Sequence, residues 1–356
     1  MKAVLLLSDG TQYDGLSIGG TGYTIGEVIF NTCMTGYQEI LTDPGTTGQI
    51  ICMTYPLIGN YGINKKSTES GRTYPKGFIF KRPCERPSNF KSEGTIEQFL
   101  KENNIIGLYD IDTRSLTRHI RDNGAMNGAL ITEDFFDKKD EIIKQINAFS
   151  IDNAIKETTC KDIQIFGKGN KYKVGIYDFG CKNSTVKALL DRNCEVSLLP
   201  AFTTADDALK MGFDAFLLSG GGGNPAENES IIKEIKIIFD AGKPVLGICM
   251  GHLILALANG IKVKKMKNGH HGGNYPVKDI NKDRVYITNQ SHSYNLDCDK
   301  IDLTAGQISH ININDNTAEG IQYNNPKVFS VQFVPDCDKG DHSTSYIFDK
   351  FIACID

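Results

Sequence analysis

The stretch Val245-Leu-Gly-Ile-Cys-Met-Gly-His-Leu253 decides the fold expected for the second half of the chain. Its first four residues predict a short buried strand, and the apolar residues after Cys249 predict a helix. Cys249 therefore stands at a strand–helix junction, as in a nucleophile elbow, where the helix N-terminus would lower the pKa of a thiol and stabilise an oxyanion. Taken alone, a buried cysteine beside a turn of small residues explains the pattern better.

Alternating strand and helix patterns surround this stretch. The expected strands are 174–177, 195–199, 215–218 and 244–248, and the expected helices are 183–191, 205–211, 230–241 and 250–259. This order predicts an α/β domain with a doubly wound, largely parallel sheet. Strand-like runs at 285–288 and 328–333 predict a small antiparallel section, followed by a final helix over 345–354.

The first half of the chain is organised differently. Short strands separated by glycine-rich turns are expected at 2–7, 26–32, 49–55 and 77–80, and helices at 95–103 and 113–123. Asp112 is the expected N-cap of the second helix and Gly124 its C′ residue. We expect a mixed β/α domain over 1–155, a linker over 156–171 and the α/β domain over 172–356.

Length and composition agree with two domains and exclude several classes. The chain has 356 residues, a net charge of −4, 40% hydrophobic and 23% charged residues, so no basic surface predicts binding to nucleic acid or membrane. No signal peptide or membrane-spanning run is expected. None of the ten cysteines forms a C-x-x-C pair, which favours reduced thiols and a cytoplasmic protein.

Two further segments contain candidate site residues. The loop Ser219-Gly-Gly-Gly-Gly-Asn-Pro225 follows an expected strand, and its backbone N–H groups could approach a ligand; a flexible turn explains it equally well. It lacks the lysine of a P-loop and the spacing of a dinucleotide fingerprint. His270 and His271 are adjacent, so on a strand they point to opposite faces. We therefore expect structural histidines and no metal site.

Together these segments resemble the small, glutamine-amidotransferase subunit of carbamoyl-phosphate synthetase over nearly the whole chain. The segments similar to that family are 30–44, 110–114, 116–118, 127–128, 177–180, 247–252 and 265–274. The resemblance implies a flavodoxin-like class I amidotransferase domain behind an N-terminal domain that contacts the large subunit.

The resemblance also implies an activity and a partner. In that family the small subunit hydrolyses glutamine and sends ammonia through a tunnel to a large subunit, where ATP and Mg²⁺ are used to make carbamoyl phosphate. A Cys attacks the amide, a His transfers protons and a Glu orients the His. No cofactor is implied in the small subunit itself.

Residue by residue, the family's nucleophile falls on Cys249, its His on Val334 and its Glu on Asp336. The family's glutamine-binding positions fall on Gly45, Gly221, Gly223, Met250, Leu253, Ser291, Ser293 and Tyr294.

Several of these positions depart from the family pattern. The family writes His-Pro-Glu where this chain has Val334-Pro335-Asp336, and a valine cannot accept a proton. The family has Gln at the position of Leu253 and Asn at that of Ser291. We therefore expect a small subunit whose glutaminase is lost or crippled. The alternatives are an active glutaminase with an unexpected base, for which His342 is a candidate, and a repurposed binding protein.

Overall fold

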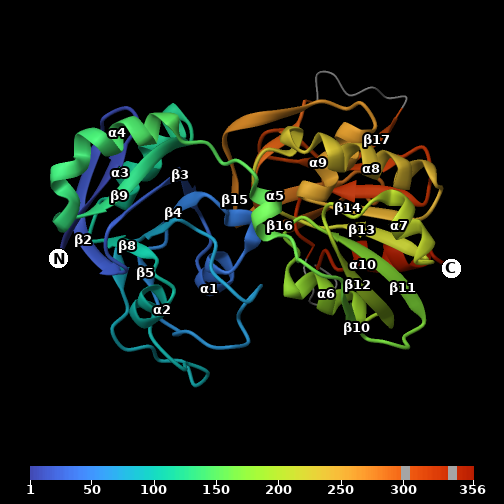
Figure 1. The fold of residues 1–356 in the computed structure, drawn as a ribbon, viewed down its shortest axis with the longest axis horizontal. Coiled ribbons are helices and arrows are strands. Elements are labelled where there is room, and N and C mark those ends of the chain that lie inside the picture. The colour runs from blue at the N-terminus through green and yellow to red at the C-terminus, as the bar shows by residue number, and fades with distance from the viewer. Residues whose placement is uncertain (298–304, 336–342) are drawn as a thin grey trace. The chain divides into compact units, whose positions relative to one another are not determined.

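The computed structural model describes residues 1–297, 305–335 and 343–356 and divides the chain into two compact units, Met1–Ile151 and Asp152–Asp356 (Figure 1). The segment 156–171, expected as a linker, contains the end of α5 (Ala154–Thr158) and the strand β10 (Gln164–Phe166), both in the second unit. In the described ranges, no helix combines the length and the apolar character needed to cross a bilayer.

The first unit is built on a closed barrel of seven strands. In barrel order they are β1 (Lys2–Leu7), β2 (Gln12–Gly19), β8 (Ile106–Tyr109), β6 (Gly77–Ile79), β4 (Gln49–Met53), β3 (Tyr23–Asn31) and β9 (Met126–Thr132). The β3–β4, β4–β6 and β6–β8 pairs are parallel and the others antiparallel. Strand β4 is buried throughout because Ile50 and Cys52 pack into one apolar cluster and Ile51 and Met53 into another.

Helices cover the barrel strands. They are α1 (Tyr37–Leu41), η1 (Pro44–Thr46), α2 (Ile96–Glu102), α3 (Thr113–Asn123), η2 (Glu133–Lys138) and α4 (Lys139–Ala148), beside the small pair β5 (Leu57–Ile58) and β7 (Arg82–Pro83). The expected caps of α3 are confirmed, since the Asp112 carboxylate accepts the Ser115 N–H at 2.9 Å and Gly124 ends the helix with φ 100°. The mixed β/α expectation for this half is therefore confirmed.

The second unit contains one ten-stranded sheet. In sheet order its strands are β10, β12 (Cys194–Pro200), β11 (Tyr172–Asp178), β13 (Ala215–Leu218), β14 (Val245–Ile248), β19 (Val328–Val331), β18 (Ala318–Tyr323), β17 (Gly306–Asn312), β15 (Val263–Asp279) and β16 (Arg284–Leu296). The five strands β12, β11, β13, β14 and β19 are parallel neighbours. Their order follows the flavodoxin-like pattern, so the expected fold is confirmed.

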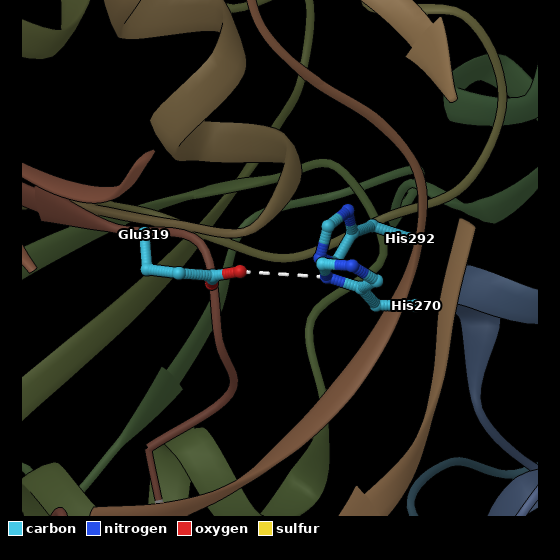
Figure 2. Close-up of side chains that lie close together, drawn as sticks. All are labelled: His270, His292 and Glu319. Carbon is cyan, nitrogen blue, oxygen red and sulfur yellow. Dashed lines mark ion pairs between the residues drawn. The ribbon is translucent and has the colours of Figure 1, made fainter. Parts of the chain in front are cut away.

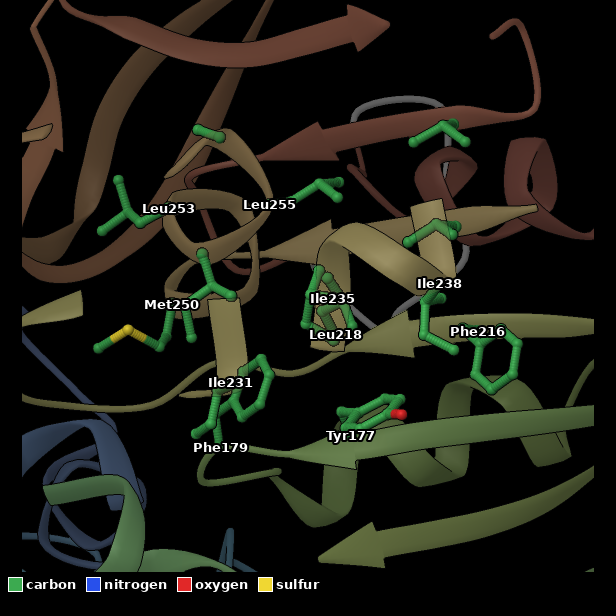
Figure 3. Packing of buried hydrophobic residues seen from close by; sticks show 14 of the residues in the cluster. Tyr177, Phe179, Phe216, Leu218, Ile231, Ile235, Ile238, Met250, Leu253 and Leu255 are labelled. Carbon is green, nitrogen blue, oxygen red and sulfur yellow. The ribbon is translucent and has the colours of Figure 1, made fainter. Parts of the chain in front are cut away.

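Helices pack on both faces of this parallel core (Figure 1). The cluster shown in Figure 3 joins α7 (Ala205–Lys210), α8 (Glu229–Asp240) and α9 (Met250–Ala258) to one face, with η3 (Pro225–Glu227) leading into α8. A second cluster joins α6 (Asn183–Leu190) and α10 (Tyr346–Ala353) to the other face. The two-sided covering explains why β14 is apolar without alternation.

The antiparallel section is much larger than expected. The sequence indicated 285–288 and 328–333. The second run was assigned wrongly, because β19 pairs in parallel with β14 and only borders the antiparallel strands. The section itself consists of β15 and β16, which form a ladder of 17- and 13-residue strands, and of β17 and β18, which connect that ladder to β19. The run from Lys264 to Asn274 is rich in Lys, Asn, Gly and His, so apolar alternation did not mark it as a strand. Pairing with β16 satisfies its backbone despite that composition.

Candidate active site

Cys249 occupies a strained turn between β14 and α9. Its backbone has φ 51° and ψ −106°, a left-handed conformation that is uncommon for a residue with a side chain, and such strain costs on the order of 1–3 kcal/mol. Its N–H donates to Val331 O of the neighbouring strand at 2.9 Å. The elbow expected from the sequence is therefore present, with Cys249 only 4% exposed.

Two glycines make this tight turn possible. A Cβ on Gly251 would lie 2.1 Å from the carbonyl oxygen of Leu218, so α9 can begin against β13 only without a side chain there. A Cβ on Gly247 would lie 2.8 Å from the Gly251 carbonyl oxygen. The small residues of the opening motif therefore serve close packing of strand and helix.

The glycine loop after β13 borders the cysteine. A Cβ on Gly220 would lie 3.8 Å from Cys249 Cβ, and one on Gly221 would lie 2.2 Å from the Phe179 carbonyl oxygen. Gly223 has φ +86° and adopts the left-handed region directly. The loop is therefore adjacent to the elbow, and close backbone packing by itself requires glycine at 221.

Two residues from other strands contact the thiol. Cys249 Sγ lies 3.7 Å from the carbonyl oxygen of Ser291 on β16, an S–H donor contact, and 3.8 Å from Nε2 of Gln332, which donates to it. Gln332 follows β19 and is fully buried. Ser291 and Gln332, which lie 42 and 83 residues after Cys249 in the sequence, thus meet at its thiol.

Val334, at the family's histidine position, lies two residues beyond Gln332. Its N–H donates to Asn289 O at 3.0 Å, forming an isolated bridge to β16. Asn289 and Ser291 are two residues apart on β16, so this strand contacts both the backbone of Val334 and the Cys249 thiol. Asp336 and His342 lie outside the described residues.

The other predicted positions fall in different surroundings. Met250 and Leu253 are each 2% exposed and pack in the apolar cluster of α7, α8 and α9 (Figure 3). Ser293 and Tyr294 are half-buried on β16. Gly45 lies in η1 of the first unit, where its N–H donates to Asp43 Oδ1 at 2.8 Å.

His252, on the first turn of α9, is fully buried and neutral. Burial, with a smaller contribution from His310, lowers the pKa of His252 to about 3. Its Nδ1 lies 2.7 Å from Ser330 Oγ on β19. The ring is therefore held as a neutral member of the core rather than as a base poised near neutral pH.

A second group of buried polar side chains lies farther along β15 and β16. His270 on β15 faces His292 on β16 in the ladder register, and Glu319 of β18 completes the group (Figure 2). Burial lowers the pKa of His270, but hydrogen bonds and charge from Asp315 and Glu319 outweigh it and raise that pKa to about 9. We call these three residues the histidine–glutamate cluster.

The sequence reasoning did not single out Gln332 or Glu319 as site residues. Gln332 carried a signal, because it is a polar amide inside the apolar run Val328–Phe333. Glu319 carried only the weaker signal of a carboxylate in a short strand-like segment, and nothing local indicates that β15 and β16 would bring two histidines to it.

Comparison with known proteins adds the family. Residues 5–130 match the family described as Carbamoyl-phosphate synthase small chain, CPSase domain, and residues 175–354 match Glutamine amidotransferase class-I. The carbamoyl phosphate synthase small chain of Syntrophotalea carbinolica is 44% identical, covering 99% of this chain and 97% of that protein. The chain belongs to the carbamoyl-phosphate synthase small-chain family.

A second relative agrees with that assignment. The small chain of Fusobacterium nucleatum is also 44% identical, over 99% of this chain and 98% of its own length. A solved glutamine amidotransferase of Thermotoga maritima is 18% identical with a TM-score of 0.37, covering 46% of this chain and 74% of that protein. In this chain, the residues that match the CPSase domain lie in the barrel unit, and those that match the class I amidotransferase domain lie in the unit that contains the elbow.

Proposed function

We propose that this chain is the small subunit of a carbamoyl-phosphate synthase whose own glutaminase half-reaction is lost or severely reduced. It acts as a structural and regulatory partner of a large subunit, and that subunit then draws on free ammonia. The observation that carries the proposal is Val334, an aliphatic residue at the position that the resemblance gives to the family's proton-transferring histidine. Its backbone pairs with Asn289, two residues before the Ser291 carbonyl that contacts the thiol.

The chemistry of amide cleavage explains why this one side chain matters. The thiol must lose its proton to attack the amide carbon, the leaving ammonia must gain one, and water must be activated to release the thioester. A positioned acid–base group contributes about 10²–10⁴-fold to such steps, and triad members act as a unit. The two thiol partners described above, the Ser291 carbonyl and the Gln332 amide, are not acid–base groups.

The surroundings of the elbow support the same proposal. Leu253, where the family has a glutamine, packs into the apolar cluster of α7, α8 and α9 and offers no polar atom to a substrate. The ring of His252 is hydrogen-bonded to the Ser330 hydroxyl, and its lowered pKa makes it a poor substitute base. The elbow is thus retained while aliphatic residues, Leu253 and Val334, stand at the positions that the resemblance gives to a glutamine and a histidine.

The proposal of a large-subunit partner rests on the first unit. Residues 5–130 match the CPSase domain of the small-chain family, and the relatives named small chain align over 97–98% of their length. ATP and Mg²⁺ would act on that partner, and this subunit would need no cofactor of its own.

The test is a comparison of nitrogen donors on the reconstituted complex with the cognate large subunit. We expect carbamoyl phosphate to form with ammonium chloride and to stay at background with glutamine. The matched control is Cys249→Ser, which should leave both rates unchanged. Robust glutamine-driven synthesis that Cys249→Ser abolishes would overturn the loss of glutaminase and favour an unexpected base. Failure to bind the large subunit would favour a repurposed protein.

A further inference from the structure

The histidine–glutamate cluster lies inside the second unit and is separate from Ser291 and Gln332, the two residues described above at the thiol. His270 and His292 are each 6% exposed, and Glu319 is fully buried. One potential ligand atom from each lies within 4.8 Å of the other two. Figure 2 shows both rings and the carboxylate converging from separate strands.

The hydrogen bonds of His270 aim a nitrogen at the carboxylate. Its Nε2 lies 2.8 Å from Asp315 Oδ2, a pure acceptor, so in a neutral ring Nε2 carries the hydrogen. In the protonated ring Nδ1 also carries a hydrogen, and it lies 3.4 Å from Glu319 Oε1, at ion-pair distance inside the protein. A metal ion bound at Nδ1 would replace that proton and keep a positive charge beside the buried carboxylate.

His292 presents a lone pair toward the same carboxylate. Its Nδ1 lies 2.8 Å from the carbonyl oxygen of Tyr294, so Nδ1 donates and Nε2 has the lone pair. Nε2 lies 2.9 Å from Gln290 Oε1, while Gln290 Nε2 donates to Glu319 Oε2 at 2.8 Å. As placed, the Gln290 oxygen faces the lone pair of His292 Nε2, so two acceptors meet. If the Gln290 amide were turned over, its nitrogen could donate to His292, but its oxygen would then face the Glu319 carboxylate. Either orientation therefore leaves two acceptors facing each other.

We propose that His270, His292 and Glu319 form a binding site for a divalent transition-metal ion such as Zn²⁺. Two imidazole nitrogens and one carboxylate oxygen are a ligand set that suits zinc, cobalt, nickel and iron(II). The ion would coordinate His270 Nδ1, His292 Nε2 and Glu319 Oε1, and so replace the Nδ1 proton of His270 and satisfy the lone pair of His292.

The groups around these ligands resemble the outer shell of a metal site. Each metal-binding histidine in proteins usually donates its other N–H to a carboxylate or a backbone carbonyl, which fixes the ring. The Asp315 carboxylate accepts such a hydrogen bond from His270, and the Tyr294 carbonyl oxygen accepts one from His292. The Asn312 amide, 3.3 Å from Glu319 Oε1, orients the carboxylate.

The spacing requires a modest closure. Ligand atoms of a tetrahedral zinc ion with bonds of about 2.0–2.1 Å lie roughly 3.4 Å apart. The widest pair here, at up to 4.8 Å, must therefore close by somewhat over an ångström. The ion would join β15, β16 and β18, and because His292 adjoins Ser291 it would also steady the strand that contacts Cys249.

The experiment uses the full chain, stripped with a chelator and titrated with Zn²⁺ or Co²⁺ alone. We expect one equivalent to bind and to raise the melting temperature. His292→Gln and Glu319→Gln should each weaken binding at least tenfold, and Asp315→Asn by about 10–100-fold. His119→Gln, which removes a histidine of the barrel unit, is the matched control and should bind as the unaltered chain does.

X-ray absorption of the zinc-loaded, unaltered chain keeps the test independent of how the variants fold. Two imidazoles with oxygen and no sulfur in the coordination shell would support the site. A sulfur ligand would assign the ion to cysteines instead. That result, the absence of binding, or unchanged affinity in His292→Gln and Glu319→Gln would overturn the proposal.

Discussion

The Cys249 thiol lies 3.8 Å from the side-chain amide nitrogen of Gln332, on the segment that reaches Val334 two residues later. The Gln332 amide and the Ser291 carbonyl therefore both contact a cysteine held in a strained turn. Under the proposed function, the geometry that presents a nucleophile is retained, and Val334 stands in place of the group that would move its proton.

Restoring the family residues at the two altered triad positions should recover little activity. Val334→His with Asp336→Glu returns a base and its partner, but Leu253 stays in the apolar cluster and Ser291 and Ser293 stay in place of the family's residues. We expect ammonia release from glutamine to remain at least tenfold below that of an active small chain. Full activity of the double variant would show that the altered pocket does not matter.

A glutamine-analogue chloroketone should fail to label Cys249. The thiol is 4% exposed and donates to Ser291 O, and the pocket lacks the family's polar contacts. Mass spectrometry after incubation would locate any adduct, and an active family member labelled in parallel is the control. Stoichiometric and selective labelling at Cys249 that glutamine prevents would argue for a working glutamine site.

Gly251→Ala should destabilise the second unit. The added Cβ would lie 2.1 Å from the Leu218 carbonyl oxygen, and overpacking of this kind costs about 1–3 kcal/mol even though alanine favours a helix by up to about 1 kcal/mol. Urea unfolding measures the change. Gly71→Ala, where a Cβ meets nothing within 4 Å, is the control and should change stability by less than about 0.5 kcal/mol.

Stability should fall as the pH drops below neutrality, and His252 should account for part of the fall. Burial lowers the pKa of His252 to about 3 from an ordinary value of 6.5, so below pH 6.5 the unfolded chain takes up a proton that the folded chain does not. Its contribution is fully present above pH 6.5 and is lost as the pH falls toward 3.

The measurement is urea unfolding at pH 8, 7, 6 and 5. Each buried neutral histidine adds at most about 1.4 kcal/mol per pH unit to the slope, and His252→Asn should remove its share. The two proteins should depend on pH almost equally between pH 7 and 8. An unchanged slope below pH 6 in His252→Asn would mean that His252 is protonated in the folded chain.

The parallel core could be predicted closely from sequence, whereas the antiparallel section could not. Strand 215–218 of that core has the expected bounds, and so does helix 113–123 of the barrel unit. Apolar periodicity and capping residues, which mark these elements, are local signals. Strand β15 contains lysines, glycines and histidines that carry no such signal, and it is held by the ladder with β16. Of the candidate site, the elbow at Cys249 was predictable from its strand–helix context.

The sequence by itself determined the elbow and the doubly wound order, because each depends on residue type and short-range pattern. Only the tertiary structure decided which groups meet. It brings Ser291 and Gln332 to the thiol, places Leu253 in the core and gathers His270, His292 and Glu319 from three strands. These contacts depend on strand register, and register is set by pairing between segments far apart in the chain.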